Sequence, residues 1–217
     1  MKINWRYTLG EILIVIIGIT IAFSLNNWSE RSKEKAQREQ YLINLKNDIE
    51  ADKAALEKNY AEIETKMIAA QKVLPVLGSN DTAAKMGAIQ DIFAVVVISN
   101  FSAKDITYNT LINSGDLKLI KDFELKTAIE SHYSEYELMM KAYERQENIQ
   151  KEYLGPYFIE HIDYDAFRRG EFGFEEERLL KNIIRSMEGS FRIKKTAIEK
   201  GIASCDALIS NLSEHLD

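Results

Sequence analysis

The sequence predicts an all-α protein in which an N-terminal transmembrane helix continues into an antiparallel helical bundle. Only two prolines, Pro75 and Pro156, and ten glycines occur in 217 residues, so long stretches contain no helix breaker. A segment near the N-terminus is uncharged and strongly apolar, and apolar residues recur at helical spacing through most of the remainder. We expect a short tail over residues 1–8, a transmembrane helix over 9–28 and a helical bundle outside the membrane over 29–217.

The N-terminal apolar segment has the length and composition of a membrane span. No residue from Ile12 to Ser29 is charged. A spanning helix needs about 20 residues, and Tyr7 to Trp28 supply this length if Glu11 lies near one interface. Aromatic side chains favour membrane interfaces, and we expect three of them there, namely Trp5, Tyr7 and Trp28.

A secretory signal peptide is the alternative interpretation of this segment. Lys2 and Arg6 would form its basic region, and Ala22-Phe23-Ser24 resembles a cleavage site. Against it, Glu11 directly precedes the apolar run, and Asn26-Asn27-Trp28 is typical of a membrane interface. We therefore favour an uncleaved anchor.

One face of the predicted span differs from the rest. Glu11, Gly18, Ala22 and Asn26 are separated by steps of seven, four and four residues, so they share a face of the helix. Small residues four apart allow two helices to approach closely, which predicts a helix–helix interface here. Glu11 could also mark an ion or proton path. We favour a carboxylate at headgroup depth, paired with Arg6 or bonded at the helix N-terminus.

The orientation follows from the short N-terminal tail. Lysines and arginines lie on both sides of the span, but a short basic tail commonly stays in the cytoplasm, and long domains cross regardless of their charge. We expect a single-pass protein of the inner (cytoplasmic) membrane with most of the chain in the periplasm. The basic residues among 29–40 form either a solvated face or a contact with lipid phosphates.

A long amphipathic helix follows the span. Its apolar residues recur at steps of three, four or seven: Leu42, Leu45, Ile49, Leu56, Tyr60, Ile63, Met67, Ala70 and Leu74. Asp52, Asn59 and Lys66 occupy the second core position of a strict heptad. Polar residues there argue against an isolated two-stranded coiled coil and for packing against other parts of the same domain.

The middle of the chain predicts two shorter helices. A turn over Pro75–Asp81 precedes a helix over Thr82–Ser99, whose buried face is expected to contain Ile89, Ile92, Phe93, Val96 and Val97. Val95–Ile98 could instead form a short strand. A further helix over residues 107–112 should end near Gly115, in a left-handed conformation.

Two more helices complete the prediction. Asp122 is the expected N-cap of the first, which breaks or kinks at Gly155-Pro156. Its tyrosine-rich face, from Tyr133 to Tyr153, is assigned to the core rather than to an aromatic ligand site. Residues 161–174 form a loop with several carboxylates, but the ordered calcium-loop pattern is missing. The last helix begins at Glu175, with a possible interruption at Gly189, and its expected apolar face includes Ile193 and Ile198.

Two motifs resemble an uncharacterised single-pass membrane family common in Bacteroidota. The first runs from Leu9-Gly10-Glu11-Ile12 to Asn26-Asn27-Trp28-Ser29-Glu30, and the second is Tyr108-Asn109-x-Leu111-Ile112-x-Ser114-Gly115-x-Leu117 with Leu119-Ile120-Lys121. That family is a domain of unknown function. The resemblance therefore implies a topology and not an activity.

Residues with catalytic potential are sparse. His132, His161 and His215 lie far apart, without the Glu-x-x-His pairs of di-iron bundles, and the single Cys205 has no partner for a disulfide or zinc site. No phosphate loop, dinucleotide fingerprint or serine-nucleophile motif occurs. The net charge of −6 argues against nucleic acid. We expect no enzyme, no cofactor and no metal.

Three functional hypotheses remain from the sequence. The leading one is a membrane-anchored helical interaction module that contacts the lipid bilayer and self-associates or serves as an accessory subunit of a membrane complex. The second is a sensory or ligand-binding bundle that acts through a partner. The third is an ion-coupled membrane component that uses Glu11.

Overall fold

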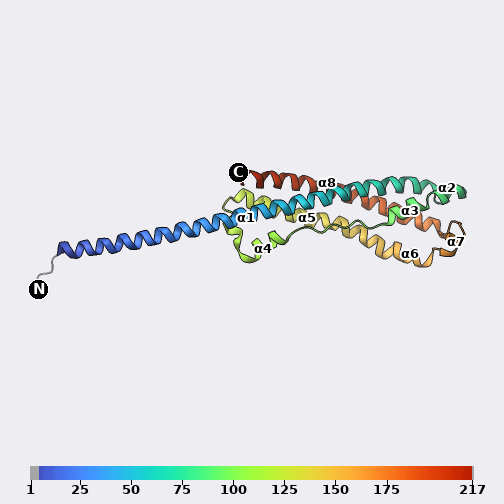
Figure 1. The fold of residues 1–217 in the computed structure, drawn as a ribbon. Coiled ribbons are helices and arrows are strands. Elements are labelled where there is room, and N and C mark those ends of the chain that lie inside the picture. The colour runs from blue at the N-terminus through green and yellow to red at the C-terminus, as the bar shows by residue number, and fades with distance from the viewer. Residues whose placement is uncertain (1–4, 217) are drawn as a thin grey trace.

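A computed structural model describes residues 5–216, with side chains at all of these positions except 5–8, 10 and 12. Within this part of the chain every regular element is a helix, and the only extended pairing is an antiparallel bridge between Ile162 and Phe174. Figure 1 shows a long helix that carries an elongated bundle at one end. The predicted all-α fold is confirmed.

Helix α1, Trp5–Val76, is one continuous helix of 72 residues. At 1.5 Å per residue it is about 108 Å long. Its first part projects alone from the bundle (Figure 1), and every described side chain from Leu9 to Asn26 is exposed. Further along, Gln37 Nε2 and Tyr41 Oη donate hydrogen bonds to Asp116 Oδ2 at 3.0 and 2.8 Å. The apolar segment therefore continues directly into the bundle, as the sequence predicts.

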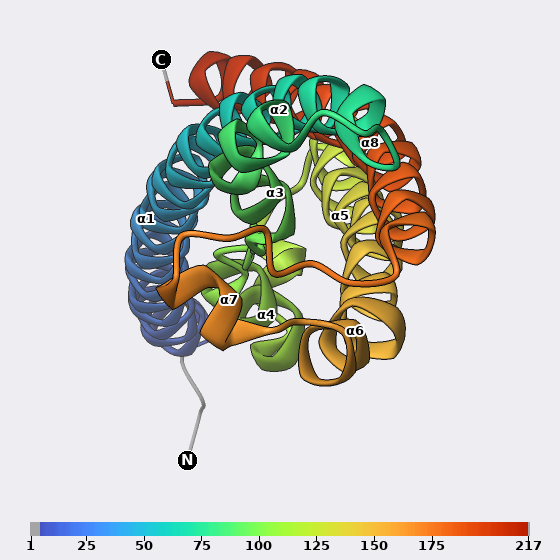
Figure 2. The same ribbon diagram turned by 90° about the vertical axis from the view of Figure 1, so that its right-hand side faces the viewer.

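Two other long helices complete the bundle. Helix α5, Phe123–Ile149, runs in the same direction as α1, whereas α8, Glu177–Glu214, runs antiparallel to both (Figure 1) and packs against both. The chain returns from the far end of α1 to the start of α5 through α2 (Thr82–Gly87), α3 (Ile89–Val96), residues 97–105, α4 (Ile106–Ser114) and the 3-10 helix η1 (Asp116–Leu119). Seen end-on in Figure 2, α3 and α4 lie between α1 and α5.

The helix predicted over Thr82–Ser99 is wrong in its extent. Ala88 separates α2 from α3, and α3 ends at Val96, after which Val97 adopts an extended conformation. The buried side chains of α3 are Ile92 and Val95, whereas Val97 is 58% exposed. The predicted buried face was wrong at Val97 because the helical period was extended past Val96, where the helix ends. The alternative strand is also absent, because Val95 and Val96 are helical.

Several predicted helix ends are confirmed. Gly115 ends α4 in the left-handed region with φ of 75°, a conformation that glycine adopts without steric cost. Asp122 caps α5, because its side chain accepts a hydrogen bond from Leu125 N at 2.8 Å. Pro75 lies in the last turn of α1, one residue before the helix ends.

The break predicted at Gly155-Pro156 is a change of helix type. The π-helix η2, Gln150–Leu154, leads into α6, Gly155–Glu160, and Gly155 N donates to Gln150 O five residues earlier. Proline lacks an N–H and clashes with the carbonyl four residues before it. The wider π-helical turn places Pro156 near the start of α6. At that position neither the missing N–H nor the clash with a preceding carbonyl ends the helical path of the backbone.

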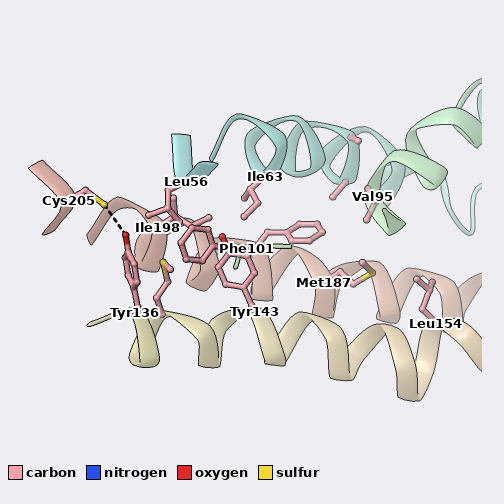
Figure 3. Packing of buried hydrophobic residues seen from close by; sticks show 14 of the residues in the cluster. Leu56, Ile63, Val95, Phe101, Tyr136, Tyr143, Leu154, Met187, Ile198 and Cys205 are labelled. Atoms are coloured by element: carbon pink, nitrogen blue, oxygen red, sulfur yellow. Dashed lines mark hydrogen bonds between the residues drawn. The ribbon is translucent and has the colours of Figure 1, made fainter. Parts of the chain in front are cut away.

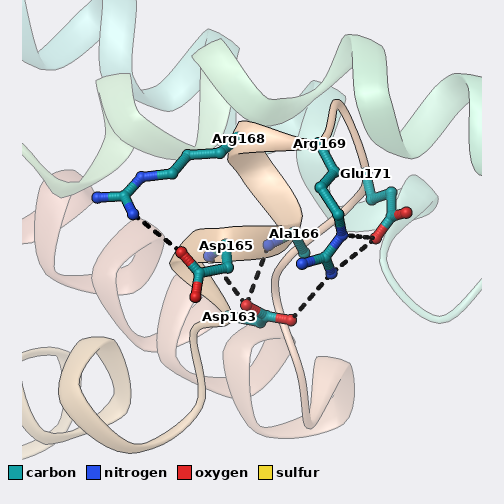
Figure 4. A network of polar contacts seen from close by, with 6 residues as sticks. All are labelled: Asp163, Asp165, Ala166, Arg168, Arg169 and Glu171. Atoms are coloured by element: carbon teal, nitrogen blue, oxygen red, sulfur yellow. Dashed lines mark hydrogen bonds and ion pairs between the residues drawn. The ribbon is translucent and has the colours of Figure 1, made fainter.

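The loop predicted over residues 161–174 contains the short helix α7, Tyr164–Arg168. Asp163 caps it, accepting hydrogen bonds from Asp165 N and Ala166 N (Figure 4). Asp165 pairs with Arg168 at 2.9 Å. Figure 4 also shows Arg169 between Asp163 and Glu171. The acidic residues of this loop therefore pair with neighbouring backbone and arginine groups.

Helix α8 begins at Glu177, two residues later than predicted, and continues through Gly189 without interruption. Ile193, predicted to lie on the apolar face, is 49% exposed, whereas Phe191 is fully buried. The buried stripe of α8 follows steps of four and three: Met187, Phe191, Lys194, Ile198, Gly201, Cys205, Leu208 and Leu212. One member of this stripe is a lysine.

The core lies along the axis of the bundle, where α1, α5 and α8 meet (Figure 3). The tyrosine-rich face of α5 belongs to this core, with Tyr136 and Tyr143 only 3% and 2% exposed. Phe101, from the non-helical segment, packs edge-to-face with the Tyr136 ring, with 5.4 Å between the centroids. Tyr153, assigned to the same face by its spacing, is 57% exposed.

Candidate functional site

The apolar segment at the start of α1 has no partner within the described chain. One helix near the N-terminus is long and apolar enough to span a membrane. Glu11, Gly18, Ala22 and Asn26 are all exposed and lie within about 80° of one another around the helix. A Cβ atom added at Gly18 would meet nothing within 4 Å. The face that the sequence singled out is therefore open to lipid or to another helix.

The predicted interfacial aromatic residues are only partly described. Trp28 is 71% exposed, at the end of the apolar segment that faces the bundle. The helical backbone begins at Trp5, but the side chains of Trp5 and Tyr7 lie outside the described part of the chain.

A second feature is the non-helical stretch of residues 97–105, here called the crossing segment, which runs along the bundle between α3 and α4. Three buried polar side chains of α1 bind its backbone. Lys66 Nζ donates to Val97 O at 2.7 Å, and Asn59 Nδ2 donates to Asn100 O at 2.9 Å. Asp52 accepts hydrogen bonds from Lys104 N, at 3.0 and 3.1 Å to its two oxygens.

The spacing of these residues fits an extended chain beside a helix. Fourteen residues of helix, from Asp52 to Lys66, rise about 21 Å. Seven residues of extended chain, from Val97 to Lys104, cover about 23 Å. The two run in opposite directions, and the heptad polar positions noted in the sequence are the contacts that hold the crossing segment on α1.

Two buried lysines meet on this segment from opposite sides. Lys194 of α8 is 1% exposed, and its Nζ donates to Ser99 O at 2.6 Å and to Gln146 Oε1 at 2.8 Å. The same ammonium lies 3.6 Å from the centroid of the Tyr143 ring. Lys66 is 5% exposed and also donates to Ser99 Oγ. Within the described residues neither lysine forms an ion pair, so the direct partners of both ammonium groups are neutral oxygens, together with the Tyr143 ring in the case of Lys194.

Burial shifts the ionisation of these groups. Desolvation, reinforced by the nearby Lys66 charge, lowers the pKa of Lys194 from 10.5 to about 7. Desolvation also lowers the pKa of Lys66. It raises the pKa of Asp52 to about 6, although the Lys104 amide partly opposes that shift. The bundle core therefore contains cations whose charge is destabilised at neutral pH.

Sequence reasoning identified half of this cluster. Asp52, Asn59 and Lys66 stood out because polar residues occupied apolar heptad positions. Lys194 gives the same signal, since it lies between Phe191 and Ile198 on the buried stripe of α8, but the neighbouring Ile193 was chosen for the core instead. Ser99 and Gln146 carry no comparable signal, because serine and glutamine are common on exposed faces.

The three histidines remain far from one another. His132 is 2% exposed, with its Nδ1 atom 2.8 Å from Ser204 Oγ, and desolvation lowers its pKa to about 4. His215 Nε2 lies 3.5 Å from Asp122 Oδ2. Within the described chain no group of three histidine, cysteine or acidic side chains could hold a metal ion.

Comparison with known proteins places the chain in a family without assigning it an activity. No curated protein and no solved structure shows significant similarity to it. The family model of DUF6090, described as a family of unknown function, matches residues 11–152. This match extends from the apolar segment through the crossing segment and α5, and it covers more than half of the chain, which therefore belongs to the DUF6090 family.

Proposed function

We propose that this protein is a membrane-anchored helical interaction module that self-associates through its N-terminal span. The exposure of the apolar segment carries this proposal, because every described side chain from Leu9 to Asn26 is exposed. Contiguous apolar surface of this size marks a membrane or protein contact. The proposed role is non-catalytic.

The face with Gly18 and Ala22 supports self-association. Lipid surrounds apolar side chains as well as another helix does, so helices associate in membranes where small residues let backbones approach. Gly18 and Ala22 lie one turn apart, and no described atom covers Gly18. The same face on a second copy of the chain is therefore the partner that we propose for it.

The first test changes the bulk of this face. Gly18→Leu inserts a large side chain where two helices should nearly touch, and we expect the dissociation constant of the oligomer to rise about tenfold, equivalent to about 1.4 kcal/mol. Ile16→Leu changes shape on a different face and serves as the matched control. The measurement is sedimentation of the purified full chain in mild detergent. Identical masses for wild type and both variants would exclude the Gly18 interface, and a mixed assembly with another protein would favour the accessory-subunit role.

We further propose that the bundle lies in the periplasm, with the span in the inner membrane. The short tail with Lys2 and Arg6 before the span supports this orientation, because such tails commonly stay in the cytoplasm, and a long domain after the span can cross the membrane regardless of its charge. Protease added to spheroplasts should then degrade residues 30–217 while a cytoplasmic control protein survives. A bundle that remains intact until the spheroplasts are lysed would reverse the orientation.

A further inference from the structure

We propose that the end of the bundle nearest the span binds the phosphate headgroup of an anionic phospholipid. The site is an open cleft of about 350 Å³ between α1 and the residues that lead into α5. Four cationic side chains and two carboxylates line it: Arg31, Lys35, Arg38, Lys121, Glu34 and Asp122. The inference rests on the proposed membrane anchoring, because the cleft must lie beside a bilayer.

Helix α1 supplies three of the cations on one face. Arg31, Lys35 and Arg38 are separated by steps of four and three residues, which places them within about 60° of one another around the helix. Arg31 and Lys35 are exposed, and Arg38 is half-buried. Their side chains therefore point to the same side of α1, towards the residues that precede α5.

The opposite wall is fixed by hydrogen bonds. Gln37 and Tyr41 both donate to Asp116, the first residue of η1, and so hold η1 against α1. Lys121 follows η1 after a short turn and faces the cations of α1 across the cleft. Leu119, which is 7% exposed, contributes apolar lining. The fold therefore joins residues that are about ninety positions apart in the sequence into one cationic site.

The carboxylates do not neutralise the cleft. Asp122 accepts the hydrogen bond from Leu125 N that caps α5, and it also lies near His215. Within the described residues none of the four cations forms an ion pair at 4.0 Å or less. Four cationic side chains against the two carboxylates leave the lining with an excess of two positive charges, which suits a phosphodiester.

The distance from the end of the span favours a lipid over a free anion. Arg31 lies three residues beyond Trp28, or about 4.5 Å along the helix, and Arg38 lies about 15 Å beyond it. The polar layer of each leaflet is about 5–8 Å thick, and long basic side chains reach back towards it. Phe123, which follows Asp122 directly, is 79% exposed and is available to acyl chains or glycerol. Basic groups near an anionic surface are attracted to its phosphates.

The test compares lipid retention by the full chain. Wild type purified in mild detergent is mixed with phosphatidylglycerol or phosphatidylcholine, and bound lipid is counted by native mass spectrometry. We expect retained phosphatidylglycerol, little phosphatidylcholine, and at least a fivefold loss of phosphatidylglycerol in the double variant Arg31→Gln with Lys121→Gln. The matched control is Lys141→Gln with Arg145→Gln, which removes the same charges from exposed positions of α5 and should retain wild-type lipid levels.

Each outcome decides the proposal. Equal retention of phosphatidylglycerol by wild type and the Arg31/Lys121 double variant would overturn the cleft as its site, as would an equal loss in the control. Displacement of the lipid by millimolar inorganic phosphate would overturn the lipid assignment in favour of a free anion. Membrane fractionation of the same cells separates the two proposals, because a chain that fails to sediment with membranes contradicts the anchoring itself.

Discussion

The bundle should gain about 2 kcal/mol of stability through Lys194 as the pH rises from 7 to 9, and Lys194→Met should remove most of the total gain. The folded chain holds the Lys194 proton with a pKa of about 7, whereas the ordinary value of 10.5 applies to the unfolded chain. Between these values the unfolded state binds more protons, so raising the pH favours the folded state, by up to about 1.4 kcal/mol per pH unit. Lys66, whose pKa is also lowered by desolvation, acts in the same direction.

Comparing variants between pH 7 and 9 isolates Lys194. His132 titrates mainly below this window, since burial lowers its pKa to about 4, whereas Cys205 opposes the gain near pH 9, because burial raises its pKa from the ordinary value of 9 to about 11. The neighbouring carboxylates, Glu62 and Glu147, act on Lys194 only through space. Urea unfolding of the detergent-solubilised chain, followed by circular dichroism, measures the stability at each pH. Lys200→Met, an exposed change on the same helix, should keep the full gain. A Lys194→Met variant with an unchanged slope would show that this ammonium is not desolvated.

Regular patterns in the sequence predicted the long elements well. The uninterrupted period of apolar residues predicted α1. Local rules predicted the end of α4 and the start of α5, since the left-handed Gly115 and the Asp122 cap depend only on the adjacent backbone. The exposed apolar segment was also predictable, because length and lack of charge define it. These features need no knowledge of distant residues.

The middle of the chain depended on tertiary contacts and was predicted less well. The apolar run at Val95–Ile98 continues a helical period, yet the helix ends at Val96. Gln150 donates to Val96 O and Lys66 donates to Val97 O, which satisfies these carbonyls outside a helix. Side chains from α1 and η2 thus stabilise an extended chain that its own residues do not specify.

The two candidate sites also differ in this respect, because one is predictable from local sequence and the other depends on tertiary contacts. The Gly18 face follows from spacing within one helix, whereas the lipid cleft needs Lys121 beside Arg31, which only the folded bundle provides. The buried polar residues of α1, Asp52, Asn59 and Lys66, lie between these two cases. Its heptad spacing predicted a partner inside the same domain, but the spacing alone did not distinguish another helix from an extended segment.

The crossing segment should depend strongly on Asn59. This side chain is 5% exposed, and besides bonding Asn100 O it donates to Tyr143 Oη at 3.2 Å. Asn59→Leu keeps a similar volume but leaves both oxygens without this donor, and each buried polar group left unpaired costs about 1–3 kcal/mol. We expect a loss of about 2 kcal/mol in the free energy of unfolding, with Asn47→Leu, an exposed change on α1, within about 0.5 kcal/mol of wild type.

A double-mutant cycle separates the contact with Tyr143 from general damage to the core. Tyr143→Phe removes the hydroxyl but keeps the ring that faces Lys194. If Asn59 and this hydroxyl act together, the double variant should be more stable than the sum of the single losses predicts, by about 0.5–1.5 kcal/mol. Additive losses would mean that Asn59 stabilises only the crossing segment through Asn100 O. A wild-type stability for Asn59→Leu would show that water replaces this donor, and the crossing segment would then be held mainly by Asp52 and Lys66.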